Sequence, residues 1–182
     1  MMNIDRCPST LVSGFTSYSP GGLRKLFDGK KVSPILPYDA PDLHGEPEEF
    51  LENREHISIS GVQEKLSVLV DRGTIRLTRA GEQGTHLLKP ISSRLTRASD
   101  MPANEHVTMQ IAAQLFGIST APNGLCFFRT GEPAYITRRF DINPESVKLR
   151  KEDFASLAGK TSAQGGSNFK YDYSYPVSYT HL

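Results

Sequence analysis

The sequence predicts an α+β fold, in which a small antiparallel sheet is combined with one main helix. Short runs of alternating polar and apolar residues flank a turn at Gly73, and a second pair of runs flanks a turn at Gly131. Between the two pairs, apolar residues recur at helical spacing from about Ala103 to Phe116. Two hairpins separated by one amphipathic helix are typical of this class.

Residues 1–56 are predicted to form an extension that wraps one side of the core. The segment has few long periodic runs of its own. Apolar residues at helical spacing predict a short helix within residues 21–29. Three prolines make residues 31–41 an extended loop, and acidic residues with a proline in the first turn make residues 46–55 a second helix candidate.

A serine-rich loop and three strands follow the extension. The loop carries the sequence SISGVQEK at residues 58–65, and strands are predicted at residues 66–71, 74–78 and 85–89. Small residues let backbone N–H groups approach an anion, and Lys89 at the end of the third strand adds a positive charge. The order is compatible with phosphate binding, whereas the loop by itself is more typical of an ordinary turn.

The main helix is predicted from about Ala103 to Phe116, with Gly117 as its C-terminal cap. Glu105 falls within its apolar arc, where a carboxylate is costly unless it is paired. Glu105 could be satisfied by the helix N-terminus or could meet a cation from the sheet, for which Lys89 is the best candidate. The apolar arc consists of Val107, Met109, Ile111, Ala112, Leu115 and Phe116. The polar side carries His106, Gln110 and Gln114.

A second hairpin is predicted from residues 124–129 and 133–140. Its second strand ends in a polar run with two adjacent arginines, which is also typical of a solvated strand end. A polar connector follows at residues 143–150, and apolar spacing predicts a short amphipathic helix at residues 152–159.

Charge and composition argue against several classes of protein. The chain has 182 residues, 21 basic and 20 acidic, so overall charge does not favour nucleic-acid binding. No apolar run is long enough to cross a membrane, and the N-terminus lacks a signal-peptide pattern. Cys7 and Cys126 lie far apart, which predicts free thiols in a reducing, cytoplasmic compartment. No His or Cys motif has metal-ligand spacing, so we expect no metal site built by this chain.

Four motifs in a fixed order are more specific than the topology. They are SISGVQEK at 58–65, THLLKP at 85–90, NEH at 104–106 and RFD at 139–141. Together they resemble the HipA family of bacterial serine/threonine kinases, which are the toxins of toxin–antitoxin pairs. The resemblance is clear across residues 54–159. It implies a kinase-like small lobe, with a phosphate loop, a strand lysine paired with a helix glutamate, and a hinge for the purine.

The resemblance implies an ATP site whose residues can be assigned by motif. Lys89 would contact the ATP phosphates, and Glu105 would orient it. Arg138 and Phe140 would meet the adenine through backbone groups, with Arg139 between them and Asp141 near the ribose. Mg²⁺ would accompany ATP, with ligands expected in the large lobe. The loop over the phosphates would consist of Ser60, Gly61, Val62, Gln63, Glu64 and Lys65.

Two loop serines are candidates for autophosphorylation. Ser58 resembles the phosphorylated loop serine of the family, and Ser60 resembles a second one, as in the short HipT branch. A phosphoserine here would carry close to two negative charges where the ATP phosphates bind. We therefore expect it to eject the loop and to lower the affinity for ATP.

The chain is expected to be a fragment of such a kinase. A kinase needs a catalytic aspartate, an asparagine and a metal-binding aspartate beyond the hinge, and Asp172 lacks that context. We therefore expect no catalytic residue here and no phosphoryl transfer by this chain alone. The expected parts are the extension at 1–56, the small lobe at 57–142, the connector and start of the large lobe at 143–175, and a non-native tail at 176–182 that matches a translated sequencing adapter.

The resemblance also implies partners. These are a DNA-binding antitoxin, a small accessory protein similar to the N-terminal subdomain of longer members, and an aminoacyl-tRNA synthetase as substrate. No membrane contact and no direct nucleic-acid contact are expected. The alternative is a non-catalytic module that binds a nucleotide or an antitoxin without chemistry.

Overall fold

The computed structural model describes residues 4–41, 65–91, 98–143, 145, 147–152, 157 and 159. The chain divides into two compact units, Met1–Phe140 and Asp141–Leu182. The first unit contains the helices α1 (Pro20–Phe27) and α3 (Met101–Gln114) and the short 3₁₀ helix η1 (Ala98–Asp100). Its strands are β1 (Leu66–Asp71), β2 (Thr74–Leu77), β3 (His86–Lys89), β4 (Asn123–Phe127) and β5 (Pro133–Arg138).

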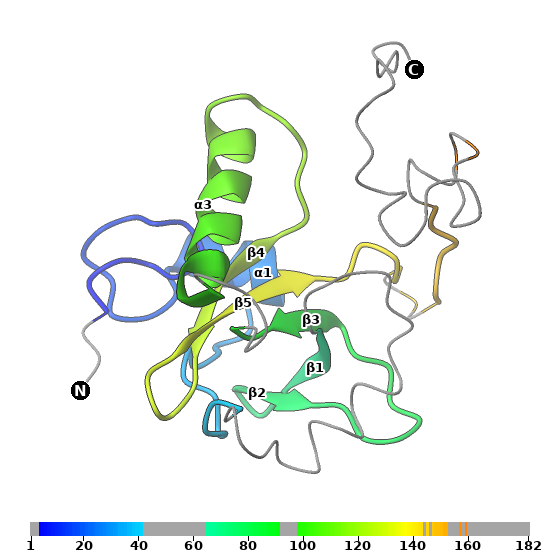
Figure 1. The fold of residues 1–182 in the computed structure, drawn as a ribbon, viewed down its shortest axis with the longest axis horizontal. Helices are drawn as coiled ribbons and strands as arrows, with labels where there is room; N and C mark the ends of the chain where they lie inside the picture. Colours follow the sequence, from blue (N-terminus) through cyan, green and yellow to red (C-terminus); the bar gives the residue numbers. More distant parts are fainter. Residues whose placement is uncertain are drawn as a thin grey trace. The chain divides into compact units, whose positions relative to one another are not determined.

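The strands form one antiparallel sheet with the order β2-β1-β3-β5-β4 (Figure 1). Helix α3 connects β3 to β4 and packs against β4 and β5. This is the predicted α+β fold of a kinase-like small lobe, an antiparallel sheet with one main helix. Each strand lies where the alternation of the sequence predicts it, with ends that differ by no more than two residues.

The turn between β1 and β2 is fixed by two residues with positive φ. Arg72 has a φ of 48° and Gly73 a φ of 81°. Two such residues give the hairpin turn whose twist matches that of the flanking strands. A Cβ on Gly73 would lie 3.1 Å from the carbonyl oxygen of Lys31, so space as well as conformation favours glycine there.

Helix α1 is capped at both ends, which explains why so short a segment is helical. Ser19 is the N-cap, and its Oγ accepts a hydrogen bond from the backbone N–H of Gly22 at 3.1 Å. Asp28 adopts the left-handed conformation, and its N–H donates to the carbonyl of Leu23. The short helix predicted within residues 21–29 is therefore confirmed.

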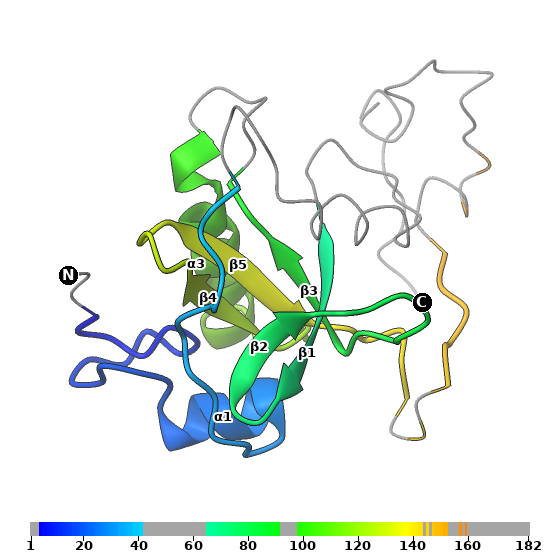
Figure 2. The same ribbon diagram turned by 90° about the horizontal axis from the view of Figure 1, so that it is seen from below.

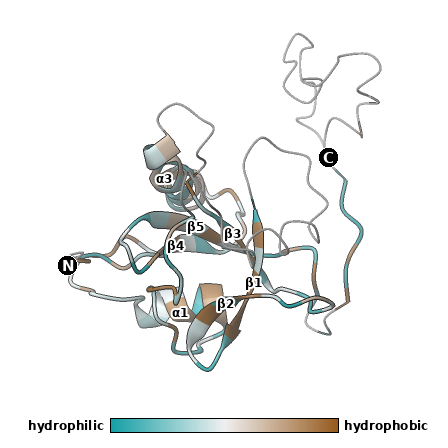
Figure 3. Cartoon of the chain, turned by 60° about the horizontal axis from the view of Figure 1, so that its bottom comes forward, coloured by the Kyte–Doolittle hydropathy of each residue, from teal (hydrophilic) through white to brown (hydrophobic). Residues whose placement is uncertain are grey.

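Among the described residues, the N-terminal extension supplies five of the fourteen buried members of the core cluster. The sheet face that carries Leu66, Val68 and Leu88 packs against the extension, and α1 and α3 lie on opposite sides of the sheet (Figure 3). The extension contributes to the core Tyr18, Leu26, Phe27, Val32 and Leu36. The wrapping extension predicted from the sequence is thus present within residues 4–41, and the sheet depends on it for burial of one face.

The extension also covers the outer edge of β4 (Figure 2). The N–H of Leu36 donates to the carbonyl of Phe127 at 2.8 Å, and the N–H of Phe127 donates to the carbonyl of Pro34 at 2.8 Å. Further along the strand, the N–H of Leu125 donates to the carbonyl of Pro8 at 2.8 Å. These bonds satisfy backbone groups that an edge strand would otherwise expose.

Helix α3 begins and ends about two residues before the predicted bounds. Pro102 lies in its first turn, where a missing N–H costs nothing. Beyond its last residue, Gly117 has a φ of 65°, and the N–H of Ile118 donates to the carbonyl of Ala112 at 3.0 Å. Gly117 therefore closes the helix as predicted.

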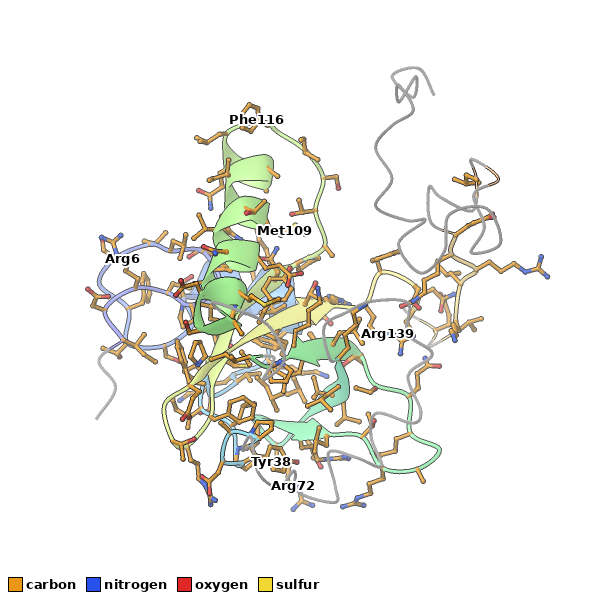
Figure 4. The ribbon with its side chains drawn as sticks, viewed as in Figure 1. Arg6, Tyr38, Arg72, Met109, Phe116 and Arg139 are labelled. Atoms are coloured by element: carbon orange, nitrogen blue, oxygen red, sulfur yellow. The ribbon has the colours of Figure 1, made fainter. Side chains whose placement is uncertain are left out.

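Helix α3 packs on the sheet with the side that looks polar in the sequence. Its buried residues are Pro102 and His106. Val107 and Ile111 are each 42% exposed, and Leu115 is 76% exposed. Figure 4 shows Phe116 at the end of α3 that lies farthest from the sheet. The outward stripe of the apolar arc is therefore not part of the core.

Some predictions fall on parts of the chain that are not described. The candidate helix at 46–55 and nearly all of the one at 152–159 lie outside the described residues. Cys7 and Cys126 are described, and both are free, as predicted; the structure also buries both. The boundaries proposed at residues 56, 142 and 175 stay predictions.

We predict that shortening a core side chain of the extension destabilises the whole sheet. Leu26→Ala should lower the free energy of unfolding by about 2–5 kcal/mol, because it removes a fully buried side chain and leaves a cavity. Urea unfolding of the 182-residue chain measures this change. Val12→Ala is the matched control, since Val12 is 53% exposed and should cost no more than about 0.5 kcal/mol. Equal stability of the two variants would contradict the role of the extension.

Candidate functional site

Lys89 and Glu105 form an ion pair between the sheet and α3. Lys89 is the last residue of β3, and its Nζ donates a hydrogen bond to Oε1 of Glu105. The two side chains are 17% and 23% exposed, so the pair is largely withdrawn from water but remains accessible. Of the two arrangements predicted for Glu105, the structure has the one in which it meets a cation from the sheet.

The pair leaves Lys89 able to bind a second group. An ammonium has three N–H donors, and Glu105 accepts one of them. Removal of either partner would destabilise the fold, because the remaining charge would be only partly solvated. Lys89 is thus a positioned cation with donors to offer on the sheet face that α3 partly covers.

Tyr135 lies beside Lys89 on the neighbouring strand. The two residues are directly opposite in the register of β3 and β5, and the Nζ of Lys89 lies 5.2 Å from the centroid of the Tyr135 ring. This distance is within the range of a cation–π contact. Burial raises the pKa of the Tyr135 hydroxyl, and the charge of Glu105 raises it further, so the phenol stays neutral. Local sequence patterns do not determine the register between these strands, so Tyr135 was not predicted.

A buried polar cluster anchors α3 to β4. The Nδ1 of His106 lies 2.8 Å from Oδ1 of Asn123, the first residue of β4, and Nε2 of Gln110 donates to the same oxygen at 3.2 Å. Nδ2 of Asn123 donates to the carbonyl of Ala121 at 2.9 Å. Because an amide oxygen only accepts, Nδ1 of His106 carries the proton. Nε2 of His106 is buried and has no hydrogen-bond partner within the described part of the chain.

The side chain of Arg138 points away from Lys89. Arg138 is opposite His86 in the register of β3 and β5, and His86 faces α1, where its Nε2 lies 2.8 Å from the carbonyl of Leu26. The guanidinium of Arg138 donates to Asp28 at the end of α1. The expectation that Arg138 would meet adenine through backbone groups stays a prediction.

The backbone around the predicted hinge is partly occupied. The N–H of Arg138 donates to the carbonyl of Pro122 at 2.8 Å, and the N–H of Arg139 donates to the carbonyl of Thr85 at 2.9 Å. An adenine contact by Arg138 would therefore use its carbonyl oxygen. Arg139 follows the end of β5 (Figure 4), and the side chain of Phe140 is exposed.

Asp141, predicted near the ribose, begins the second unit of the chain. Its side chain is buried, and its Oδ2 accepts a hydrogen bond from Nζ of Lys151 at 3.0 Å. Its carbonyl accepts the N–H of Leu149 at 2.7 Å. Asp141 is thus held within its own unit by contacts that the sequence did not predict.

Other predicted site residues lie in or beside the loop before β1. Lys65 directly precedes β1 and is half-buried. The predictions for Ser58, Ser60, Gly61, Val62, Gln63 and Glu64 lie outside the described residues. Among the residues that are described, no three His, Cys, Asp or Glu side chains gather in a metal-binding group. No helix in the described ranges has the length and apolarity needed to span a membrane.

We predict that Lys89 and Glu105 are energetically coupled. We consider a double-mutant cycle of Lys89→Met and Glu105→Gln. The losses of unfolding free energy in the two single variants should add up to more than the loss in the double variant. A coupling of about 1 kcal/mol is expected for a half-buried pair in contact. Urea unfolding of the four proteins measures it. The exposed pair Arg129–Asp39 is the matched control and should couple by less. Strict additivity at Lys89 and Glu105 would contradict the pair.

We predict that the fold loses stability in mild acid. Burial lowers the pKa of His106 and of His86 below the ordinary value of 6.5. The unfolded chain therefore binds more protons than the folded one below that pH. The stability contributed by these neutral rings is fully present above about pH 6.5 and is lost as the pH falls toward the folded pKa values. The slope can reach about 1.4 kcal/mol per pH unit for each ring.

Urea unfolding between about pH 8 and about pH 5 measures this slope. His106→Gln keeps a donor for Asn123 and removes the titrating group, so its slope should be smaller than that of the parent chain. Identical slopes for the two proteins would show that His106 is not responsible.

Comparison with known proteins supports the family suggested by the motifs. Residues 57–182 match the family model of the HipA-like C-terminal domain. "Putative kinase Y4mE" of Sinorhizobium fredii is 28% identical over 123 residues. That match covers 63% of this chain and 28% of the relative, so the chain spans less than a third of that protein. Because the family model matches well over half of its residues, this chain belongs to the HipA-like C-terminal domain family.

Proposed function

We propose that this chain is the nucleotide-binding small lobe of an ATP-dependent kinase. The observation that carries the proposal is the ion pair between Lys89 on β3 and Glu105 on α3. In protein kinases a lysine on the third strand pairs with a glutamate of the following helix and contacts the nucleotide phosphates. Membership of the HipA-like family and the kinase name of the relative support the same function.

The geometry of Lys89 suits a polyphosphate ligand. Within the described part of the chain, Glu105 accepts one of the three N–H donors of the ammonium, which leaves two donors for a ligand. Positioning and charge stabilisation provide most of the catalysis in phosphoryl transfer, so a fixed ammonium is the contribution expected of a small lobe. Mg²⁺ would neutralise part of the phosphate charge, and its carboxylate ligands are not among the described residues.

We further propose that the acceptor is a serine or threonine hydroxyl and that the loop serines Ser58 and Ser60 are autophosphorylated. The motifs around these residues support this, because they resemble the loop of the HipA family. A toxin role, a DNA-binding antitoxin and an aminoacyl-tRNA synthetase substrate are proposals that rest on the resemblance to the HipA family alone.

We predict that Lys89 is acylated by an acyl-phosphate derivative of ATP. Such a probe places its carbonyl next to the amine that contacts the phosphates, and the amine displaces the phosphate to form an amide. Mass spectrometry should find Lys89 labelled, and excess ATP should prevent the labelling. Glu105→Gln should reduce the ATP-protected labelling by roughly fivefold, which corresponds to about 1 kcal/mol of lost orientation.

The exposed lysine Lys30 is the internal control, because its labelling should not depend on ATP. Labelling of Lys89 that ATP does not prevent would contradict the proposed nucleotide site. A non-catalytic nucleotide-binding module would show ATP-protected labelling but no phosphate transfer in a protein that carries the complete family domain.

A further inference from the structure

We infer that Tyr135 is a positioning residue, whose ring holds the ammonium of Lys89 together with the carboxylate of Glu105. The role of this arrangement in nucleotide binding rests on the function proposed above. Tyr135 belongs to none of the four sequence motifs, and its assignment comes from the register of the sheet and from its position outside the cluster that the sheet forms with the extension.

The register brings the two side chains together. Tyr135 and Lys89 are directly opposite on β5 and β3, so both project from the same sheet face. Glu105 reaches Lys89 from α3, which packs on β4 and β5. Lys89 therefore has a carboxylate as one neighbour and an aromatic face, 5.2 Å from its nitrogen, as another.

Helix α3, which packs on β5, covers the side of the sheet on which Tyr135 is buried. The side chain of Tyr135 is 1% exposed, yet it is not part of the hydrophobic cluster that the sheet forms with the extension. Its strand neighbours Ala134 and Ile136 do belong to that cluster. Because side chains alternate along a strand, the ring lies on the opposite face, in the layer with Lys89 and Glu105.

An aromatic ring positions a lysine in a way that a second carboxylate could not. Lysine has a flexible four-carbon stem, so fixing its ammonium costs conformational entropy. If contacts within the protein already order the side chain, this entropy is not lost when a ligand binds. A second carboxylate would leave the site with net negative charge and would repel phosphate. The neutral ring attracts the ammonium through its quadrupole and leaves the full positive charge for a ligand.

Tyr135 is itself held in place. Its backbone lies between two paired strands, opposite Lys89 of β3 on one side and Leu125 of β4 on the other. Thr137, two residues along β5 on the same face, donates from Oγ1 to the carbonyl of Pro122 at 3.2 Å, next to the start of β4. The position of Tyr135 is thus fixed by a central strand of the sheet, which is what a positioning residue requires.

The test distinguishes the effect of losing the ring from the effect of losing the hydroxyl. It also distinguishes both from the general effect of losing a buried side chain. The variants are Tyr135→Phe, which keeps the ring, and Tyr135→Leu, which removes it. Tyr18→Leu is the matched control, because Tyr18 is a buried tyrosine of the core cluster on the other face. Each protein is prepared as the 182-residue chain with ¹³C-labelled lysine, and the Lys89 signals are assigned with Lys89→Arg.

The first readout is the chemical shift of the Lys89 ε protons. A ring face beside the ammonium shields these protons, so the parent chain and Tyr135→Phe should show them upfield of the exposed lysines. Tyr135→Leu should lose the upfield shift, whereas Tyr18→Leu should keep it. The parent chain alone can overturn the inference, since an unshifted Lys89 signal would mean that the ring does not hold the ammonium.

The second readout is ATP-protected acylation of Lys89. Tyr135→Leu should reduce it about fivefold, and Tyr135→Phe should remain close to the parent. A Tyr135→Leu variant that loses the upfield shift but labels like the parent would overturn the role in nucleotide positioning. If the shift responds as expected but no protein shows ATP-protected labelling, Tyr135 positions Lys89 and it is the proposed nucleotide function that fails.

Discussion

Burial of one sheet face against the N-terminal extension is the interaction on which the rest of the structure depends. Residues such as Leu26, Phe27 and Leu36 pack against the strands from one side and bring their apolar surface out of water. The extension also pairs with the exposed edge of β4 through backbone hydrogen bonds. The family match begins at residue 57, so the segment that completes the core precedes the part of the chain that defines the family.

Because the core lies on that face, the opposite face can carry polar groups. Helix α3 is attached there by the Lys89–Glu105 ion pair and by the contacts of His106 and Gln110 with Asn123. Polar contacts of this kind specify one arrangement more sharply than apolar contacts do, since each buried group must find its partner. The helix therefore fixes the depth and direction of Glu105, which in turn fixes the ammonium of Lys89.

The side chains on the sheet face under α3 also explain how the ammonium of Lys89 is held in position while it remains accessible. Lys89 has an acidic side chain and an aromatic ring as neighbours, both supplied by elements that pack against β3 or pair with it. One neighbour contributes charge and the other contributes only a polarised surface, so the site remains cationic toward an anion that approaches from the accessible side. Under the function proposed above, that anion is the phosphate chain of a nucleotide.

The sequence by itself determined the elements and much of the ion pair. The alternation along each strand, the turn at Gly73 and the cap at Gly117 each depend on residues that are close neighbours in the sequence. Local patterns are therefore sufficient to predict them. Glu105 was identified as a partner for Lys89 because a carboxylate within an apolar arc requires a cation.

Only the tertiary structure decided which side of α3 meets the sheet and which residues of the strands face each other. The helix turns the side of His106 inward, contrary to its polarity in the sequence, because Asn123 offers a buried acceptor seventeen residues along the chain. Tyr135 reaches Lys89 through a strand register that joins segments from separate hairpins. Such contacts depend on distant segments meeting in space, and no local pattern records them.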